Sequence, residues 1–152
     1  MKTIETTRFG QLEYSEEEVI VFEKGIPGFE QEKKFILVKM DNEDQLNPLA
    51  FLQSTNSGEL SFIIANPFSF YADYEFNLDE ATKEELEIKE TEDVAVWGVL
   101  SVPEEFEKTT INLQAPVIIN VKKKVGKQII LHENNFATKT PLFPQKITQG
   151  GK

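Results

Sequence analysis

Short apolar runs, each ended by turn-forming residues, are the feature that most restricts how this chain can fold. Residues 19–22 (VIVF) stop before a turn with two glycines and a proline, and residues 60–64 (LSFII) stop before Asn66 and Pro67. Runs of this length and spacing are typical of antiparallel barrels and sandwiches. Val and Ile total 23 against 19 for Leu and Ala, which also favours strands. We therefore predict an all-β fold, either an antiparallel barrel or a sandwich.

One short helix is expected within this β pattern. Asp79 is a suitable N-cap for a helix over residues 79–86, and acidic residues follow it in the first turn. Residues 70–76 carry alternate aromatics, which predicts a strand, and residues 117–121 and 128–131 predict a hairpin with Gly126 in its loop. We expect one domain over residues 1–143 and a flexible C-terminal tail over residues 144–152.

The inventory of reactive residues excludes several classes of protein. No apolar run is long enough to cross a bilayer, and the N-terminus has no secretory h-region, so a cytoplasmic protein without membrane contact is predicted. The absence of cysteine and the single histidine, His132, exclude thiolate and multi-histidine metal sites. The acidic stretch 41–44 lacks the glycine of a calcium loop, and no phosphate-binding motif occurs. We expect neither a cofactor nor a metal.

Charge is distributed unevenly along the chain. Residues 1–107 hold 25 acids and 8 bases, a net charge of −17, whereas residues 108–152 hold 1 acid and 8 bases, a net charge of +7. Proteins that bind duplex nucleic acid need a dominant basic face, so direct binding of nucleic acid is not expected. An acidic body instead favours a partner with a basic surface, although acids also keep a small domain in solution.

Five sequence blocks resemble the flagellar assembly factor FliW family, in the family's order. The blocks are residues 22–30 (FEKGIPGFE), 51–54 (FLQS), 62–67 (FIIANP), 71–76 (YADYEF) and 109–120 (TTINLQAPVIIN). The resemblance covers residues 1–143. It implies an all-β fold, a small antiparallel barrel-like domain, in a protein that is not an enzyme.

The resemblance also implies two partners, flagellin and CsrA, a dimeric RNA-binding translational repressor. Members of the family bind flagellin in the cytoplasm and antagonise CsrA noncompetitively, which relieves repression of flagellin mRNA. Accumulating flagellin then occupies the family member and frees CsrA. Flagellin and CsrA on one shared surface, or on two separate surfaces, are both compatible with this switch.

The candidate partner-binding residues are acids and aromatics near turns. Tyrosine beside acids suits contact with a basic partner, because its ring supplies area while its hydroxyl stays hydrated. Phenylalanines next to turns are candidate apolar anchors, whereas Phe62, Ile64 and Trp97 are expected in the core. The predicted surface residues are Glu16, Glu17, Phe29, Phe68, Asp73, Tyr74 and Glu75.

Three other functions are compatible with the residues. The first is a generic acidic β-barrel module that binds peptides, and the second is a flagellin chaperone with no role toward CsrA. The third is a carboxylate hydrolase, in which Asp73 and Glu75 lie on one face of a strand and act as an acid/base pair. The lysine-rich segment 122–127 is interpreted as a charged loop that protects a strand edge.

Overall fold

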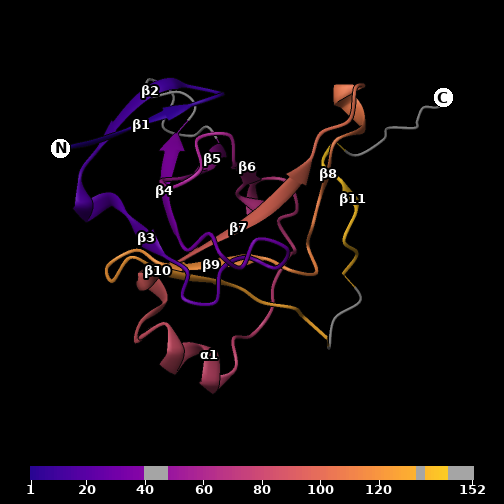
Figure 1. Cartoon of the computed structure of the whole chain (residues 1–152). Helices are drawn as coiled ribbons and strands as arrows, with labels where there is room; N and C mark the ends of the chain where they lie inside the picture. The colour runs from indigo at the N-terminus through magenta and orange to yellow at the C-terminus, as the bar shows by residue number, and fades with distance from the viewer. Residues whose placement is uncertain (40–47, 133–135, 144–152) are drawn as a thin grey trace.

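The computed structural model describes residues 1–39, 48–132 and 136–143 (Figure 1). The strands are β1 (Lys2–Thr6), β2 (Gly10–Tyr14), β3 (Ile20–Val21), β4 (Lys34–Lys39), β5 (Leu49–Ser54), β6 (Ser61–Ala65), β7 (Val94–Ser101), β8 (Thr110–Ile111), β9 (Val117–Asn120), β10 (Val125–Gln128) and β11 (Thr140–Pro141). The helix α1 covers Glu80–Glu85, and the short 3₁₀ turns are η1 (Glu16–Glu18), η2 (Pro67–Ser69), η3 (Thr91–Asp93) and η4 (Phe106–Lys108). The expected tail, residues 144–152, and the acidic stretch 41–44 lie outside the described residues.

Seven strands close into a barrel. Their order is β7-β6-β5-β4-β3-β10-β9, and β9 pairs with β7 to complete the ring. All neighbours are antiparallel except β3 and β10, which are parallel and pair through Val21 and Val125. Strand β7 is long enough to leave the barrel at Leu100 and pair with β8, and β8 pairs with β11. The predicted all-β barrel with one short helix is confirmed.

The barrel interior is filled by apolar side chains that alternate along the strands. Phe22, Phe35, Leu52, Ile64 and Val117 are fully buried within it. Burial of each such side chain stabilises the fold by about 1.5–3 kcal/mol relative to leaving it exposed to water. The expectation of a core position is confirmed for Ile64, and the half-buried Phe62 and Trp97 pack against the same cluster.

Gly126 lies in β10 and not in a hairpin loop, so its predicted place was wrong. A Cβ atom on Gly126 would come within 2.8 Å of the Phe22 ring, so the missing side chain makes room for a core aromatic. The turn between β9 and β10 is formed by residues 121–124, and Lys124 takes a positive φ of 59° there. The hairpin itself is present: its first strand lies where it was predicted, and its second strand begins at Val125 and not at Gln128.

A second apolar cluster lies outside the barrel interior. Its buried members include Ala65, at the end of β6, and Tyr74, Ile111, Leu113 and Leu142, which lie outside the seven barrel strands. The hairpin formed by β1 and β2 was not predicted, and it is attached through an edge-to-face contact of Phe9 with Phe51, 5.0 Å between ring centroids. None of the helices in the described ranges is long and apolar enough to span a membrane.

Candidate partner-binding surface

The segment from β6 to α1, residues 66–79, supplies four of the six described aromatic side chains in the second apolar cluster. The Asn66 side chain accepts a hydrogen bond from the Phe68 amide at 2.9 Å and starts η2, with Pro67 in its first position. Beyond η2 the chain continues without a helix or strand until Asp79, whose carboxylate accepts from the Thr82 amide at 2.8 Å and caps α1. The predicted N-cap is confirmed, and the predicted strand over residues 70–76 was wrong.

Tyr74 anchors this segment to the rest of the protein. Its side chain is 4% exposed, and its hydroxyl donates to the carbonyl of Leu113 at 2.8 Å. The rings of Phe68, Phe76 and Phe136 lie 5.6, 5.4 and 4.8 Å from the Tyr74 ring. Burial raises the pKa of the Tyr74 phenol, so it stays protonated. The prediction that Tyr74 lies on the surface was wrong, because the alternate aromatic spacing comes from packing around this ring and not from a strand.

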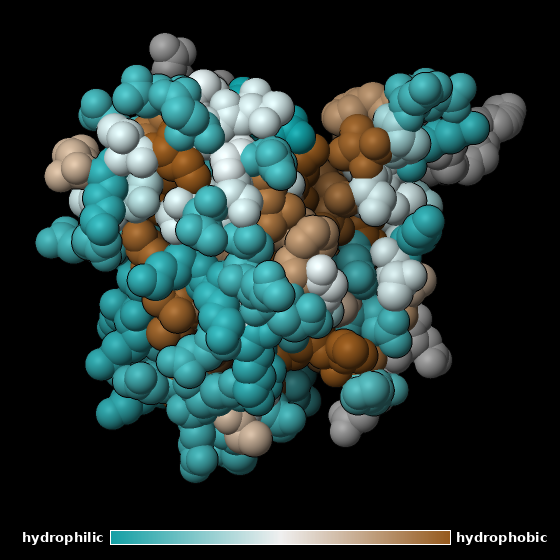
Figure 2. Space-filling view, viewed as in Figure 1, coloured by the Kyte–Doolittle hydropathy of each residue, from teal (hydrophilic) through white to brown (hydrophobic). Residues whose placement is uncertain are grey.

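Exposed and half-buried apolar side chains from residues 68–70, 102–106 and 143 make up what we call the aromatic surface. Phe106 and Val102 are 55% and 42% exposed, and Phe68 is 42% exposed. The Phe143 ring lies between Phe106 and Phe70, with centroids 5.2 and 6.4 Å away. Figure 2 shows hydrophobic side chains at the base of the projection at the upper right, where Figure 1 places η4 and β8. The aromatic surface is defined by Phe68, Phe70, Val102, Phe106 and Phe143.

Three exposed carboxylates lie beside Phe106 of the aromatic surface in the sequence. Glu104, Glu105 and Glu107 flank Phe106, and only Glu105 has an ion pair among the described residues, with Lys108 at 2.9 Å. An exposed aromatic residue between three acids is a sequence signal that pattern reasoning missed. It could have been found, because a phenylalanine in an acidic turn has no strand or helix to bury it.

Two cavities are lined in part by residues 66–79, which we call the Tyr74 segment. One has a volume of about 540 Å³ and is lined by Phe70, Asp73, Tyr74 and Phe136, among others. The other, about 510 Å³, lies between residues 75–82 and residues 129–132. Asp73 lines the first cavity and Glu75 the second. The two carboxylates therefore do not form the facing pair that the hydrolase hypothesis requires.

The other predicted residues lie apart from this segment. Glu16 and Glu17 are exposed on η1, where Glu16 pairs with Lys2 at 2.9 Å, and the Lys2 ammonium lowers the pKa of Glu16. Phe29 is 43% exposed, and its ring packs edge-on against Phe62 at 5.3 Å. In the part of the chain that the structure describes, no hydrogen bond, ion pair or ring contact joins these residues to the Tyr74 segment.

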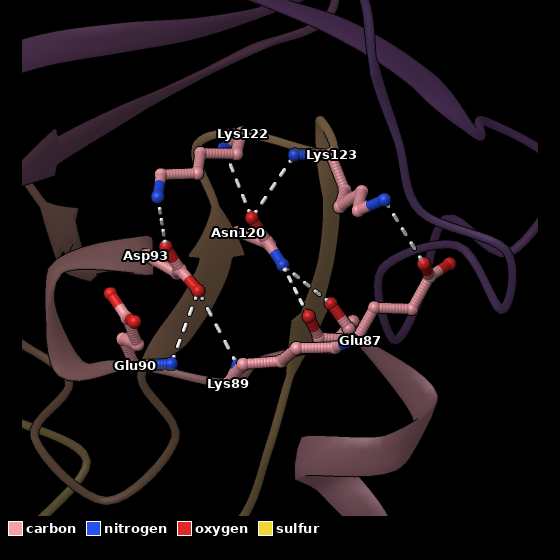
Figure 3. Close-up of polar contacts among 8 residues, drawn as sticks. Glu87, Lys89, Glu90, Asp93, Asn120, Lys122 and Lys123 are labelled. Atoms are coloured by element: carbon pink, nitrogen blue, oxygen red, sulfur yellow. Dashed lines mark hydrogen bonds and ion pairs between the residues drawn. The ribbon is translucent and has the colours of Figure 1, made fainter.

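A polar clamp, centred on Asn120, fastens the C-terminal side of α1 to the β9–β10 turn (Figure 3). Asn120 is 1% exposed. Its side-chain amide donates to the carbonyls of Leu86 and Glu87 at 2.8 and 3.0 Å, and its oxygen accepts from the amides of Lys122 and Lys123, both at 3.0 Å. Glu87 has a positive φ of 57°, so the clamp holds the chain where it turns away from the helix. In the sequence, Asn120 stands out only as the last residue of the block 109–120.

The lysines of the β9–β10 hairpin are held by acids of the α1 region. Lys122 pairs with Asp93 at 3.0 Å, and Lys127 pairs with Glu85 at 2.8 Å. The hydrogen bond from Lys122, together with bonds from backbone amides, lowers the pKa of the Asp93 carboxyl below its ordinary value. These lysines therefore join two parts of the fold, which differs from the predicted role of protecting a strand edge.

A metal site in the described part of the chain would require a group of side chains that can ligate the ion. No group of three or more His, Cys, Asp or Glu side chains that could hold a metal ion occurs within residues 1–39, 48–132 and 136–143. His132 is exposed and lines the 510 Å³ cavity. What the surface offers is apolar contact area with carboxylates around it, which is suited to binding another protein.

Comparison with known proteins decides the family. A sequence profile described as FliW protein matches residues 3–142. The chain belongs to the FliW family. The flagellar assembly factor FliW of Bacillus licheniformis is 45% identical over 139 residues, which cover 91% of this chain and 95% of that protein. The factor of the same name from Caldicellulosiruptor saccharolyticus is 47% identical over 135 residues, 89% of this chain and 86% of its own length.

A solved FliW structure has the same fold. The crystal structure of the flagellar assembly factor FliW superposes with a TM-score of 0.88 at 43% sequence identity, and the match covers 95% of this chain and 99% of that one. The resemblance stated from the sequence blocks is thereby confirmed. The names of these relatives describe an assembly factor, which is by name a non-enzymatic role.

Proposed function

We propose that the protein is a cytoplasmic flagellar assembly factor that binds flagellin and, by partner switching, antagonises CsrA. The observation that carries this proposal is the family relation, with 44% identity to the flagellar assembly factor FliW of Bacillus subtilis over 91% of this chain. Binding to CsrA would be noncompetitive with RNA and would relieve repression of flagellin mRNA. Flagellin would displace CsrA from the protein and restore repression.

The aromatic surface supports the flagellin part of the proposal. Unassembled flagellin has amphipathic terminal segments, and an amphipathic segment is recognised by an apolar groove or patch that covers its apolar face. Phe68 and Phe106 stand exposed over packed aromatic neighbours, so they are supported as anchors without being buried. Large aromatic side chains of this kind dominate binding energy in protein interfaces.

The charge distribution supports the CsrA part. An RNA-binding protein must present basic residues, and the net charge of −17 over residues 1–107 attracts such a surface and speeds the encounter. Since binding free energies are linked, RNA bound to CsrA must weaken binding of this protein by the same factor by which this protein weakens RNA binding.

The test is calorimetric titration of the protein with CsrA, then again after saturation with flagellin. We expect CsrA binding that flagellin abolishes, and weaker CsrA binding at about 300 mM than at about 50 mM salt. Binding of flagellin alone would leave a chaperone without a role toward CsrA. If neither protein binds, the proposal fails and a generic peptide-binding module is the better account.

A matched pair of variants tests the aromatic surface. Phe68 and Phe29 are equally exposed, at 42% and 43%, but their rings pack against Tyr74 and Phe62 respectively. We expect Phe68→Ala to weaken flagellin binding about tenfold or more, as for a hot-spot residue, and Phe29→Ala to leave it near wild type. Equal losses in both variants, or a loss only in Phe29→Ala, would contradict this placement.

A further inference from the structure

One edge of the extended chain that follows β10 has no backbone partner among residues 1–39, 48–132 and 136–143, and we call it the open edge. The amides of Ile129 and Leu131 donate to the carbonyls of Pro116 and Gln114 at 3.0 and 2.8 Å, which continues the pairing of β10 with the chain that enters β9. In an extended chain, alternate peptide groups point to opposite edges. The N–H and C=O of Ile130 therefore face away from this pairing. On that side β3 pairs with β10 only at Val125, so it does not reach Ile130.

The segment that faces the open edge, residues 75–78, is also extended. Residues 75–78 form neither helix nor strand, and no backbone hydrogen bond of these residues occurs within the described part of the chain. The two segments line the same cavity of about 510 Å³. Ile129, Ile130 and His132 line one side of it, and residues 75–79 line the other. In Figure 1 the two segments run below the barrel, where the chain descends into α1. We call this cavity the slot.

The side chains around the slot define the chemistry of its occupant. Ile130 is 55% exposed, and Phe76 and Leu78 add apolar surface on the opposite side of the slot. Glu75 is exposed, and it has no ion pair with any described residue. Lys127, on the same strand as the open edge, is already held by Glu85. The slot therefore combines apolar walls with an unneutralised carboxylate.

We propose that the slot binds an extended segment of a basic protein partner by β-strand addition. The segment would pair its backbone with the open edge at Ile130, place alternate apolar side chains on the walls, and bring a Lys or Arg to Glu75. A helix would not suit this edge, because its backbone groups are already bonded within the helix. The inference rests on the proposed function for the identity of the basic partner, CsrA. It places CsrA in the slot and flagellin on the aromatic surface, so the two partners bind at different places.

The decisive variant removes one backbone donor. Ile130→Pro deletes the outward N–H but keeps the amides of Ile129 and Leu131, which make the internal pairs. Ile130→Val keeps the N–H and a β-branched side chain, and it is the matched control. We expect Ile130→Pro to weaken CsrA binding about tenfold or more, while Ile130→Val stays within about threefold of wild type. Flagellin binding should be retained by both variants, which also shows that they fold.

Two further readouts distinguish strand addition from other contacts. Hydrogen exchange at the Ile130 amide should slow when CsrA binds the wild-type protein, because the amide becomes bonded. Glu75→Gln should weaken CsrA binding more than Asp73→Asn at low salt, because Asp73 lines the other cavity. CsrA binding that is unchanged in Ile130→Pro, or that leaves the Ile130 amide unprotected, would overturn strand addition and leave the proposed function standing. Failure of the wild-type protein to bind CsrA would overturn both.

Discussion

Replacement of Asn120 tests whether the polar clamp stabilises the fold. In Asn120→Ala, two backbone carbonyls lose a donor and two backbone amides lose an acceptor. A net hydrogen bond contributes about 1 kcal/mol, and unsatisfied buried groups cost more, whereas the lysine amides lie in an exposed turn and can bind water. We therefore expect the free energy of unfolding to fall by about 3 kcal/mol.

The assay is thermal and urea unfolding of the variant beside the wild type. For a chain of 152 residues, the usual unfolding entropy per residue makes about 3 kcal/mol equivalent to about 10 °C in Tm. The matched control is Asn56→Ala, since Asn56 is exposed and its side chain makes no hydrogen bond with a described residue. We expect the Tm of this control to change by less than about 2 °C.

The location of the loss is part of the same prediction. Hydrogen exchange in the Asn120→Ala variant should rise first at residues 86–93, because the clamp joins that segment to the barrel. A Tm equal to that of the control would refute the view that these four bonds are a major contribution to stability. A loss of Tm with uniform exchange would show that the barrel, and not the α1 attachment, depends on Asn120.

Three further substitutions test the packing and the charges. Tyr74→Phe leaves the buried Leu113 carbonyl without its donor and should lower the free energy of unfolding by about 1–2 kcal/mol in urea titration. Gly126→Ala puts a Cβ within 2.8 Å of the Phe22 ring and should cost about 1–3 kcal/mol in the same assay, with no loss if the ring moves freely. Because the folded pKa of Asp93 is lowered, its stabilisation is present above the unfolded pKa and is lost as pH falls through the folded value. Asp93→Asn should therefore be less stable than wild type at about pH 7, and the difference should shrink below about pH 3, as urea titrations at both pH values would show.

The barrel could be predicted because its strands carry their own signals. Residues 117–120 are all buried, and residues 95–100 place half-buried apolar side chains on both apolar clusters, so the composition and length of these runs identify them as strands. Asp79 is a local signal of the same kind, since a cap needs only its own helix. The β1–β2 hairpin was missed because its strands are mostly exposed and carry polar residues, so no apolar run marks them.

The binding surface was harder to predict because it depends on contacts between distant segments. The spacing of Phe70, Tyr74 and Phe76 fits a strand, but the Tyr74 hydroxyl bonds to Leu113 and its ring packs against Phe136, neither of which is near it in the sequence. Gly126 shows the same limit, because its role is set by Phe22 across the barrel. Residue type predicted that these positions matter, while only the fold shows which of them are buried.

The position of Tyr74 gives the proposed partner switch a physical basis. Its ring lines the 540 Å³ cavity and contacts Phe76, which lines the slot, and it also supports Phe68 of the aromatic surface. A flagellin segment on the aromatic surface and a CsrA segment in the slot would thus rest on one short chain, residues 68–76, without touching each other. Because residues 68–76 are packed together and shift as a unit, a shift that improves binding at the aromatic surface changes the width of the slot, and the reverse also holds. Mutual exclusion on two separate surfaces then requires only that the two partners prefer different positions of this segment.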